Sequence, residues 1–232
     1  MADRSPPTEA TTGQHVGEPT DSAPVDRALP GSGAALSSGV LLANVAVTQG
    51  LLAGVVLVGL FVFEIPLAAL GVSPEPWVLG VPAVIVGIVL GAALWLLSEA
   101  AALVADAAGI GYDEQLRALL APASPGGWAA LFAIVLPLIA VAEELLFRAA
   151  LIGVPAAGLD VSPWSFAVGS SVAFALGHGA QGRVGIVATG VLGLVLASAF
   201  VLTGSLLAVV VAHYVVNALE FGVHEGLGVE FA

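Results

Sequence analysis

Long apolar runs are the feature that most constrains how this chain can fold. After residue 39 about six such runs follow one another, separated by segments rich in turn-forming Gly, Pro and Ser, such as 71–76. A helix needs about 20 apolar residues to cross the hydrocarbon core of a bilayer. We therefore predict an all-α fold, a polytopic membrane helix bundle with about six transmembrane helices. The predicted spans are 40–63, 77–104, 127–153, 163–180, 184–203 and 205–223.

The composition excludes several classes of protein. Apolar residues make up 59% of the chain and charged residues only 9%, whereas about 25% of the residues in soluble domains are charged. Five basic and 17 acidic residues give a net charge of −12, which leaves no basic patch for nucleic acid. The absence of Cys excludes disulfides, a thiol nucleophile and a Cys-based zinc site. The partners that remain are the lipid bilayer and molecules within it.

The runs also indicate how the chain is divided. The first 38 residues are rich in Pro, Ser, Thr, Gly and acids, which predicts a disordered polar tail. No apolar run follows Arg4, so this segment does not resemble a signal peptide. Residues 112–120 carry leucines on one side and charges on the other, which favours a short interfacial helix. The predicted divisions are a tail at 1–38, two transmembrane helices with the interfacial segment at 39–126, a core of four transmembrane helices at 127–225, and a C-terminal tail at 226–232.

The arginines predict an orientation in the membrane. If the chain crosses six times, Arg4, Arg27, Arg117 and Arg183 all fall on the same side. Short loops rich in Arg and Lys stay in the cytoplasm. We therefore predict a multi-pass protein of the cell membrane with both termini in the cytoplasm.

Three charged residues stand inside the third apolar run. Glu143, Glu144 and Arg148 would each cost about 2.5–3.5 kcal/mol in the middle of a lone membrane helix. Glu144 and Arg148 are four residues apart and can pair on one face of a helix. Glu143 is turned about 100° away and has no local partner. A structural ion pair would explain two of these charges, whereas a functional carboxylate would explain the third.

Two later runs carry polar groups at helical spacing. Phe174 and His178 lie one turn apart on the fourth run, and His213 and Asn217 do so on the sixth. A lone His near a helix end is often an interfacial anchor, so each pair taken alone is weak evidence. Polar groups in hydrocarbon need partners, and the interior of the bundle is where they find them. We therefore expect these residues to meet the three charges of the third run in one intramembrane pocket.

These three motifs, Glu-Glu-x-x-x-Arg, Phe-x-x-x-His and His-x-x-x-Asn on successive hydrophobic helices, resemble those of a known family. The chain is similar to the CPBP family (CAAX protease and bacteriocin-processing proteins, also called Abi) over about residues 127–225. Members of this family are similar to the enzymes that remove the last three residues from prenylated CAAX proteins. The resemblance implies an intramembrane protease that acts on a membrane-anchored or lipidated protein or peptide.

The resemblance also implies a role for each motif residue. Peptide hydrolysis needs a base close to the attacking water and donors aimed at the developing oxyanion. The implied roles are Glu143 as the residue that activates water, Glu144 as its partner, Arg148 as the organiser of the first motif, Phe174 as packing beside the site, His178 as the second member of the water-activating pair, and His213 and Asn217 as oxyanion donors.

The same residues leave the question of a metal open. Glu143, His178 and His213 could supply the three protein ligands of an open zinc site, with Glu144 as the base. Against zinc, the two histidines come from separate helices, and no acid obviously orients either ring. We favour the version without metal, in which Glu143 and His178 share the water directly.

Two other classes of function remain as alternatives to a protease. A membrane immunity or scaffold protein would use the same pocket for binding alone, although all the polar motif positions are filled here. A proton-coupled transporter would also place Glu and His inside the membrane, but it would favour inverted repeats or paired broken helices, and we detect neither. The zinc-protease pattern His-Glu-x-x-His is missing as well.

Overall fold

The structure, a computed structural model, describes Met1 and residues 37–109, 115–159, 161–179 and 182–229. Contacts divide the chain into residues 1–35 and 36–232, and every described helix belongs to the second unit. The predicted polar tail lies almost wholly outside the described residues, as does the start of the predicted interfacial helix. All described elements are helices, which confirms the all-α prediction.

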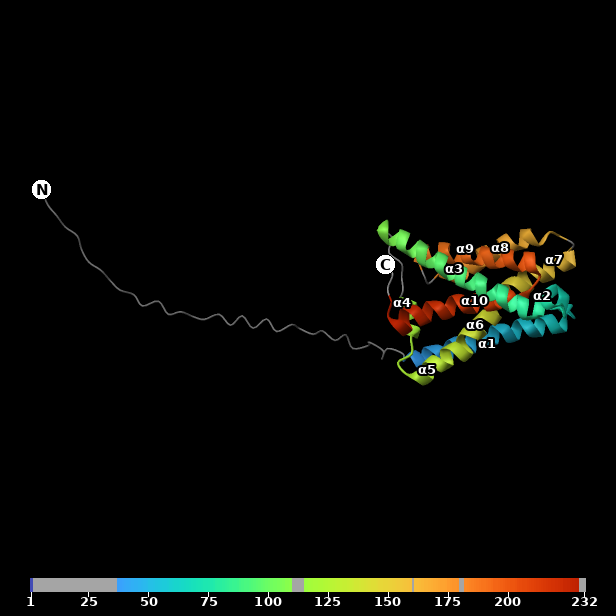
Figure 1. Cartoon of the computed structure of the whole chain (residues 1–232), viewed down its shortest axis with the longest axis horizontal. Coiled ribbons are helices and arrows are strands. Elements are labelled where there is room, and N and C mark those ends of the chain that lie inside the picture. The colour runs from blue at the N-terminus through green and yellow to red at the C-terminus, as the bar shows by residue number, and fades with distance from the viewer. Residues whose placement is uncertain (2–36, 110–114, 160, 180–181, 230–232) are drawn as a thin grey trace. The chain divides into compact units, whose positions relative to one another are not determined.

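The helices follow one another with short connections (Figure 1). Their bounds are α1 (Ser38–Val62), η1 (Leu67–Leu70), α2 (Pro76–Leu79), α3 (Val81–Ala107), α4 (Gln115–Leu120), α5 (Pro125–Ala130), η2 (Leu131–Val135), α6 (Leu136–Glu144), η3 (Leu145–Gly153), α7 (Val154–Leu159), α8 (Pro163–Gly177), α9 (Gly182–Thr203), α10 (Leu206–Glu220) and η5 (Phe221–Gly226).

Five of the described helical stretches are long and apolar enough to cross a bilayer. They are α1, α3, the continuous stretch Pro125–Leu159, α9 and the stretch Leu206–Gly226. Large apolar side chains on these helices face outward, and Phe61 and Leu202, for example, are 83% and 75% exposed. Such an exposed apolar surface suits lipid rather than water. The chain is a multi-pass membrane protein.

The fourth predicted span differs from the sequence-based expectation. It forms α8, which has only 15 residues and is about 22 Å long, shorter than the roughly 30 Å hydrocarbon core. The helix starts at Pro163, whose missing N–H costs nothing in a first turn. It ends at His178, whose Nδ1 lies 2.8 Å from the carbonyl oxygen of Phe174. Five stretches, rather than six, therefore meet the length of a full span.

The chain nevertheless passes along the bundle six times, because α8 provides the return from α7 towards α9 (Figure 1). The turn between α9 and α10 lies beside α2, where Ser205 Oγ donates a hydrogen bond of 2.7 Å to the carbonyl of Val78. At the opposite end, Leu42 of α1 packs against Leu120 and Leu131. The start of α1 and the end of η5 consequently lie at the same end of the bundle.

The stretch Pro125–Leu159 contains two π-helical segments, η2 and η3, on either side of α6. Pro137 lacks an N–H and crowds the preceding turn, which explains a widened helix just before it. The second widened segment begins directly after Glu144. Single π turns are frequent at functional sites because they re-aim neighbouring side chains.

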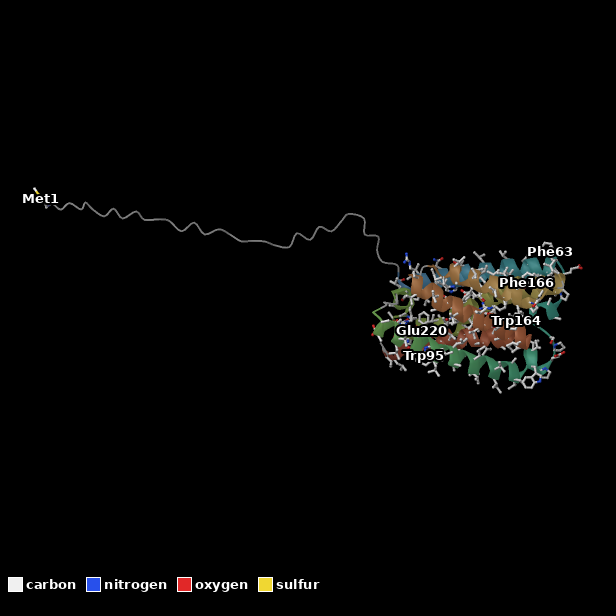
Figure 2. All side chains as sticks on the ribbon, turned by 90° about the horizontal axis from the view of Figure 1, so that it is seen from above. Met1, Phe63, Trp95, Trp164, Phe166 and Glu220 are labelled. Carbon is white, nitrogen blue, oxygen red and sulfur yellow. The ribbon has the colours of Figure 1, made fainter. Side chains whose placement is uncertain are left out.

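Helix α10, which carries His213, packs closely against α3. A Cβ atom built on Gly87 would lie 2.6 Å from the carbonyl oxygen of Ala208, and one on Gly91 would lie 2.5 Å from that of Ala212. Only glycine permits this approach of the two backbones. Figure 2 shows the resulting bundle with apolar side chains around it.

Candidate active site

Glu143 lies close to the middle of the stretch Pro125–Leu159, and only 9% of it is exposed. Its two carboxylate oxygens have different surroundings. Oε1 accepts a hydrogen bond of 3.0 Å from Nε2 of Gln49 on α1. Oε2 is buried and receives no hydrogen bond from any described residue. One oxygen of this buried carboxylate therefore accepts a hydrogen bond. The other, called the open oxygen below, has no hydrogen-bond donor among the described residues.

Two imidazole rings face this open oxygen. The Nε2 atoms of His178 and His213 lie 3.9 Å and 3.8 Å from Glu143 Oε2. Both separations exceed a direct hydrogen bond but suit a single bridging water. Nδ1 of His178 donates to the carbonyl of Phe174, and Nδ1 of His213 donates to Oε1 of Glu144, each at 2.8 Å. Both partners can only accept in these arrangements, so each ring is oriented with Nε2 towards Glu143.

Glu144 and Arg148 form a second layer behind His213. Arg148 Nε lies 3.0 Å from Glu144 Oε2, so the pair predicted from the four-residue spacing is formed. Glu144 is fully buried and Arg148 is 1% exposed. Arg148 Nη2 also donates a hydrogen bond of 3.2 Å to the carbonyl of Gly193 on α9. Glu144 thus contacts Arg148, as the spacing predicted, and also His213, whereas the resemblance implied that Glu144 acts as the partner of Glu143.

Phe174 packs against the polar groups as the sequence predicted. Its ring centroid lies 4.5 Å from that of His178 and 6.1 Å from that of His213. The guanidinium carbon of Arg148 stands 4.8 Å from the same centroid, a favourable cation–π distance. Phe147 meets the ring edge-on at 5.0 Å. The aromatic ring therefore keeps both imidazoles and the ion pair in place.

Asn217 lies one turn beyond His213 on α10 and is half-buried. Its carboxamide makes no hydrogen bond with another described residue. It is the one predicted site residue that the structure does not connect to the others through a direct contact between described residues.

Residues 125–219 match the family described as type II CAAX prenyl endopeptidase Rce1-like. This segment is an Rce1-like domain. It contains all seven predicted site residues, and family membership implies a hydrolase with protein or peptide substrates. No curated protein and no solved structure matches the chain.

Two residues of the pocket were missed by the sequence analysis. Gln49 belongs to α1, outside the Rce1-like domain, and its carboxamide inside an apolar run was a signal comparable to that of Glu143. Gly193 gave no signal, since glycine is common in this chain. A Cβ atom at Gly193 would lie 3.0 Å from Phe174 Cδ1, so the Phe174 ring packs closely against the backbone of α9 at this glycine.

The donor set of the Rce1-like domain offers limited support for a metal. Glu143, His178 and His213 present one oxygen and two nitrogens to a common point, and Glu144 orients His213 as a metal-bound histidine is usually oriented. From the sequence we expected no acid beside either ring, and this expectation was wrong. However, these three ligand atoms do not all lie within 4.8 Å of one another. Another group of three ligand atoms among the described residues does meet this limit. The arrangement fits a shared water better than a preformed zinc site.

A second polar cluster lies at the end of the bundle that carries α4. Arg117 pairs with Glu220 and, at 2.9 Å, with Glu225, while His224 Nε2 lies 2.9 Å from Glu99 Oε1. The cluster connects α3, α4 and the end of α10, and it holds the C-terminal end of the helix that carries His213 (Figure 2 labels Glu220).

Proposed function

We propose that this protein is an intramembrane endopeptidase that cleaves near the membrane-anchored or lipidated end of a protein substrate. One observation carries the proposal. The open Oε2 atom of Glu143 is buried in the bundle and lies 3.8–3.9 Å from two imidazole Nε2 atoms. A water held between these atoms would be close to a base and shielded from bulk solvent.

The chemistry follows from these positions. Glu143 Oε2 takes one proton from the water, and the water oxygen attacks the carbonyl carbon of the scissile peptide bond. His178 Nε2 helps to hold the water. The carbonyl oxygen becomes an oxyanion, which His213 Nε2 and the Asn217 carboxamide stabilise as donors. Glu143 then returns its proton to the leaving nitrogen as the carbon–nitrogen bond breaks.

Glu144 and Arg148 support this role of His213. Donation from Nε2 while Nδ1 donates to Glu144 requires the doubly protonated, cationic ring. The buried carboxylate of Glu144 accepts from the His213 ring and pairs with Arg148. The Glu144–Arg148 pair is neutral by itself, so a cationic His213 ring carries one positive charge towards Glu143 and the developing oxyanion.

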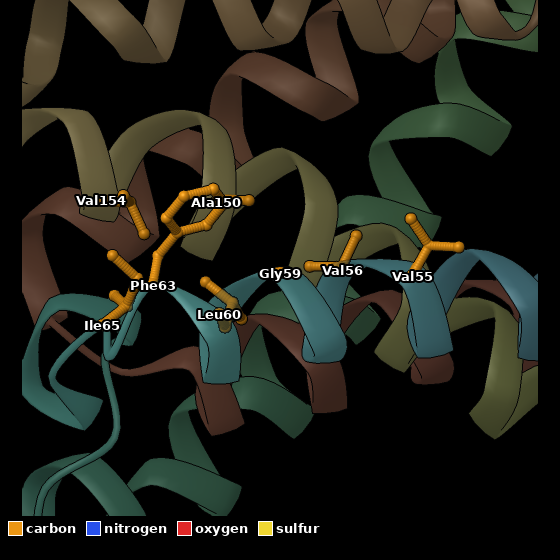
Figure 3. Close-up of a pocket in the computed structure, with 8 residues that line it drawn as sticks. All are labelled: Val55, Val56, Gly59, Leu60, Phe63, Ile65, Ala150 and Val154. Atoms are coloured by element: carbon orange, nitrogen blue, oxygen red, sulfur yellow. The ribbon is translucent and has the colours of Figure 1, made fainter.

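An apolar cavity of about 550 Å³, open to the outside of the bundle, lies between α1 and the η3–α7 segment (Figure 3), and two of its lining residues, Val55 and Phe63, are 72% and 77% exposed. It is lined by Val55, Val56, Gly59, Leu60, Phe63, Ile65, Ala150 and Val154. Val56 follows Gln49 by seven residues on α1, so the cavity begins about 10 Å along the helix from the residue that contacts Glu143. A cavity of this size and character suits the hydrocarbon chain of a lipidated substrate while its peptide lies at Glu143.

The experiment is cleavage of a prenylated CAAX peptide by the purified protein in proteoliposomes. We expect Glu143→Gln to lower kcat by at least about 100-fold, because it removes the base with little change in shape. Glu75→Gln, which changes an exposed glutamate remote from the site, should retain wild-type activity. Cleavage by Glu143→Gln at the wild-type rate would contradict the proposed mechanism.

A further inference from the structure

Gln49 reaches the candidate active site from outside the Rce1-like domain. Its Nε2 donates a hydrogen bond of 3.0 Å to Glu143 Oε1, across a sequence separation of 94 residues. Gln49 lies on α1, and the family match begins at residue 125. A polar side chain in a membrane helix is costly unless it has a partner in the bundle. Here Glu143 is that partner.

The hydrogen bond makes the two oxygens of Glu143 unequal. A carboxylate only accepts hydrogen bonds, so the amide nitrogen of Gln49, not its oxygen, must face Glu143. The bond occupies Oε1 and fixes the rotation of the carboxylate plane. Oε2 is then the oxygen that points between the Nε2 atoms of His178 and His213. Without the bond, the carboxylate could rotate away from both rings.

We propose that Gln49 is a positioning residue, which holds Glu143 so that Oε2 alone acts on the water. The role rests on the proposed function, since it concerns the base of that reaction. It also means that the Rce1-like domain forms a complete site only together with α1.

The first test compares two variants of Gln49 that differ in their ability to donate. Gln49→Met keeps the length and apolar packing but has no N–H, and we expect kcat to fall by about 10–100-fold with KM changed by less than about threefold. Gln49→His has a ring N–H at a similar reach, and its kcat should exceed that of Gln49→Met. A role in packing alone would give the reverse order, because Met suits a membrane helix better than His. Thr48→Val, on the exposed face of α1, is the matched control.

The second test examines the contact without a substrate. The chain has no Cys, so the pair Gln49→Cys and Glu143→Cys can be joined by a short bifunctional thiol reagent, with Thr48→Cys and Glu143→Cys as the control pair. We expect efficient cross-linking only for the first pair. Absence of that cross-link, or wild-type kcat in Gln49→Met, overturns the role of Gln49 but leaves the proposed protease intact. If the double-cysteine variant cross-links but the wild-type protein cleaves no peptide, the proposed protease is overturned, and the role of Gln49 with it.

Discussion

At the scale of single residues, the site depends on charges that are buried and matched. Glu144 and Arg148 lie almost wholly out of contact with solvent, and each has a second polar partner, His213 for the acid and the Gly193 carbonyl for the base. Their attraction offsets the cost of burying both charges only while both are present. We therefore expect Arg148 to be needed for the fold as well as for the candidate site.

Removal of Arg148 should destabilise the protein. We expect Arg148→Ala to lower the free energy of unfolding by about 3–5 kcal/mol, because Glu144 would remain charged and buried with one partner lost. The double variant Arg148→Met with Glu144→Leu should recover much of the stability, but not the activity. Thermal unfolding in detergent measures both effects. An Arg148→Ala variant that is inactive but fully stable would instead indicate that Arg148 contacts the substrate.

At the scale of helices, the lengths and the packing of the helices place the polar groups at the same level along the bundle. Helix α8 ends at His178, and Glu143 lies near the middle of Pro125–Leu159, so a short helix meets the centre of a long one. Ser170 of α8 donates a hydrogen bond to the carbonyl of Phe147 and holds the two helices together. A full-length fourth helix would have carried its last turn, and His178, past Glu143.

The cavity beside α1 gives a prediction about the lipid part of the substrate. A Cβ atom at Gly59 has no neighbour within 4 Å, so Gly59→Phe should fold normally and fill the cavity. We expect the KM for a prenylated peptide to rise by about tenfold, since several buried methylene groups would be displaced. Gly54→Phe, at an equally open position of α1 outside the cavity, is the control. An equal loss of activity towards the same peptide without its lipid would contradict this use of the cavity.

At the scale of the whole molecule, the six passes place the start of α1 and the end of η5 at one end of the bundle. Arg117 in α4 and Arg183 in the first turn of α9 lie at this end, whereas the opposite end carries η1 and α2. From the positive-inside rule we expect this end to face the cytoplasm.

We therefore predict that both termini are cytoplasmic. Single cysteines in place of Ser5 and Ala232 are clean probes, because the chain has no Cys of its own. In intact cells an impermeant thiol reagent should label neither position, and it should label both after the membrane is made permeable. Labelling of one position alone in intact cells would contradict an even number of crossings.

The sequence by itself determined the membrane fold and pointed to most of the residues of the candidate site. Hydrocarbon accepts long apolar helices and penalises charge, so runs of apolar residues mark the helices, and the exceptions, such as Glu143 and Arg148, mark the site. The pairing of Glu144 with Arg148 was also predictable, because the four-residue spacing is a local property of a helix.

Only the tertiary structure decided which faces of different helices meet. Spacing within one helix cannot predict that Gln49 of α1 binds Glu143, that two histidines converge on one carboxylate oxygen, or that Glu144 turns towards His213. These contacts depend on helix rotation, on depth in the bundle and on close approaches at glycines such as Gly193. The packing of all the helices together sets the rotation and the depth of each helix. Most of the surface of each helix is equally apolar, so the sequence of a single helix does not show which face meets a neighbour.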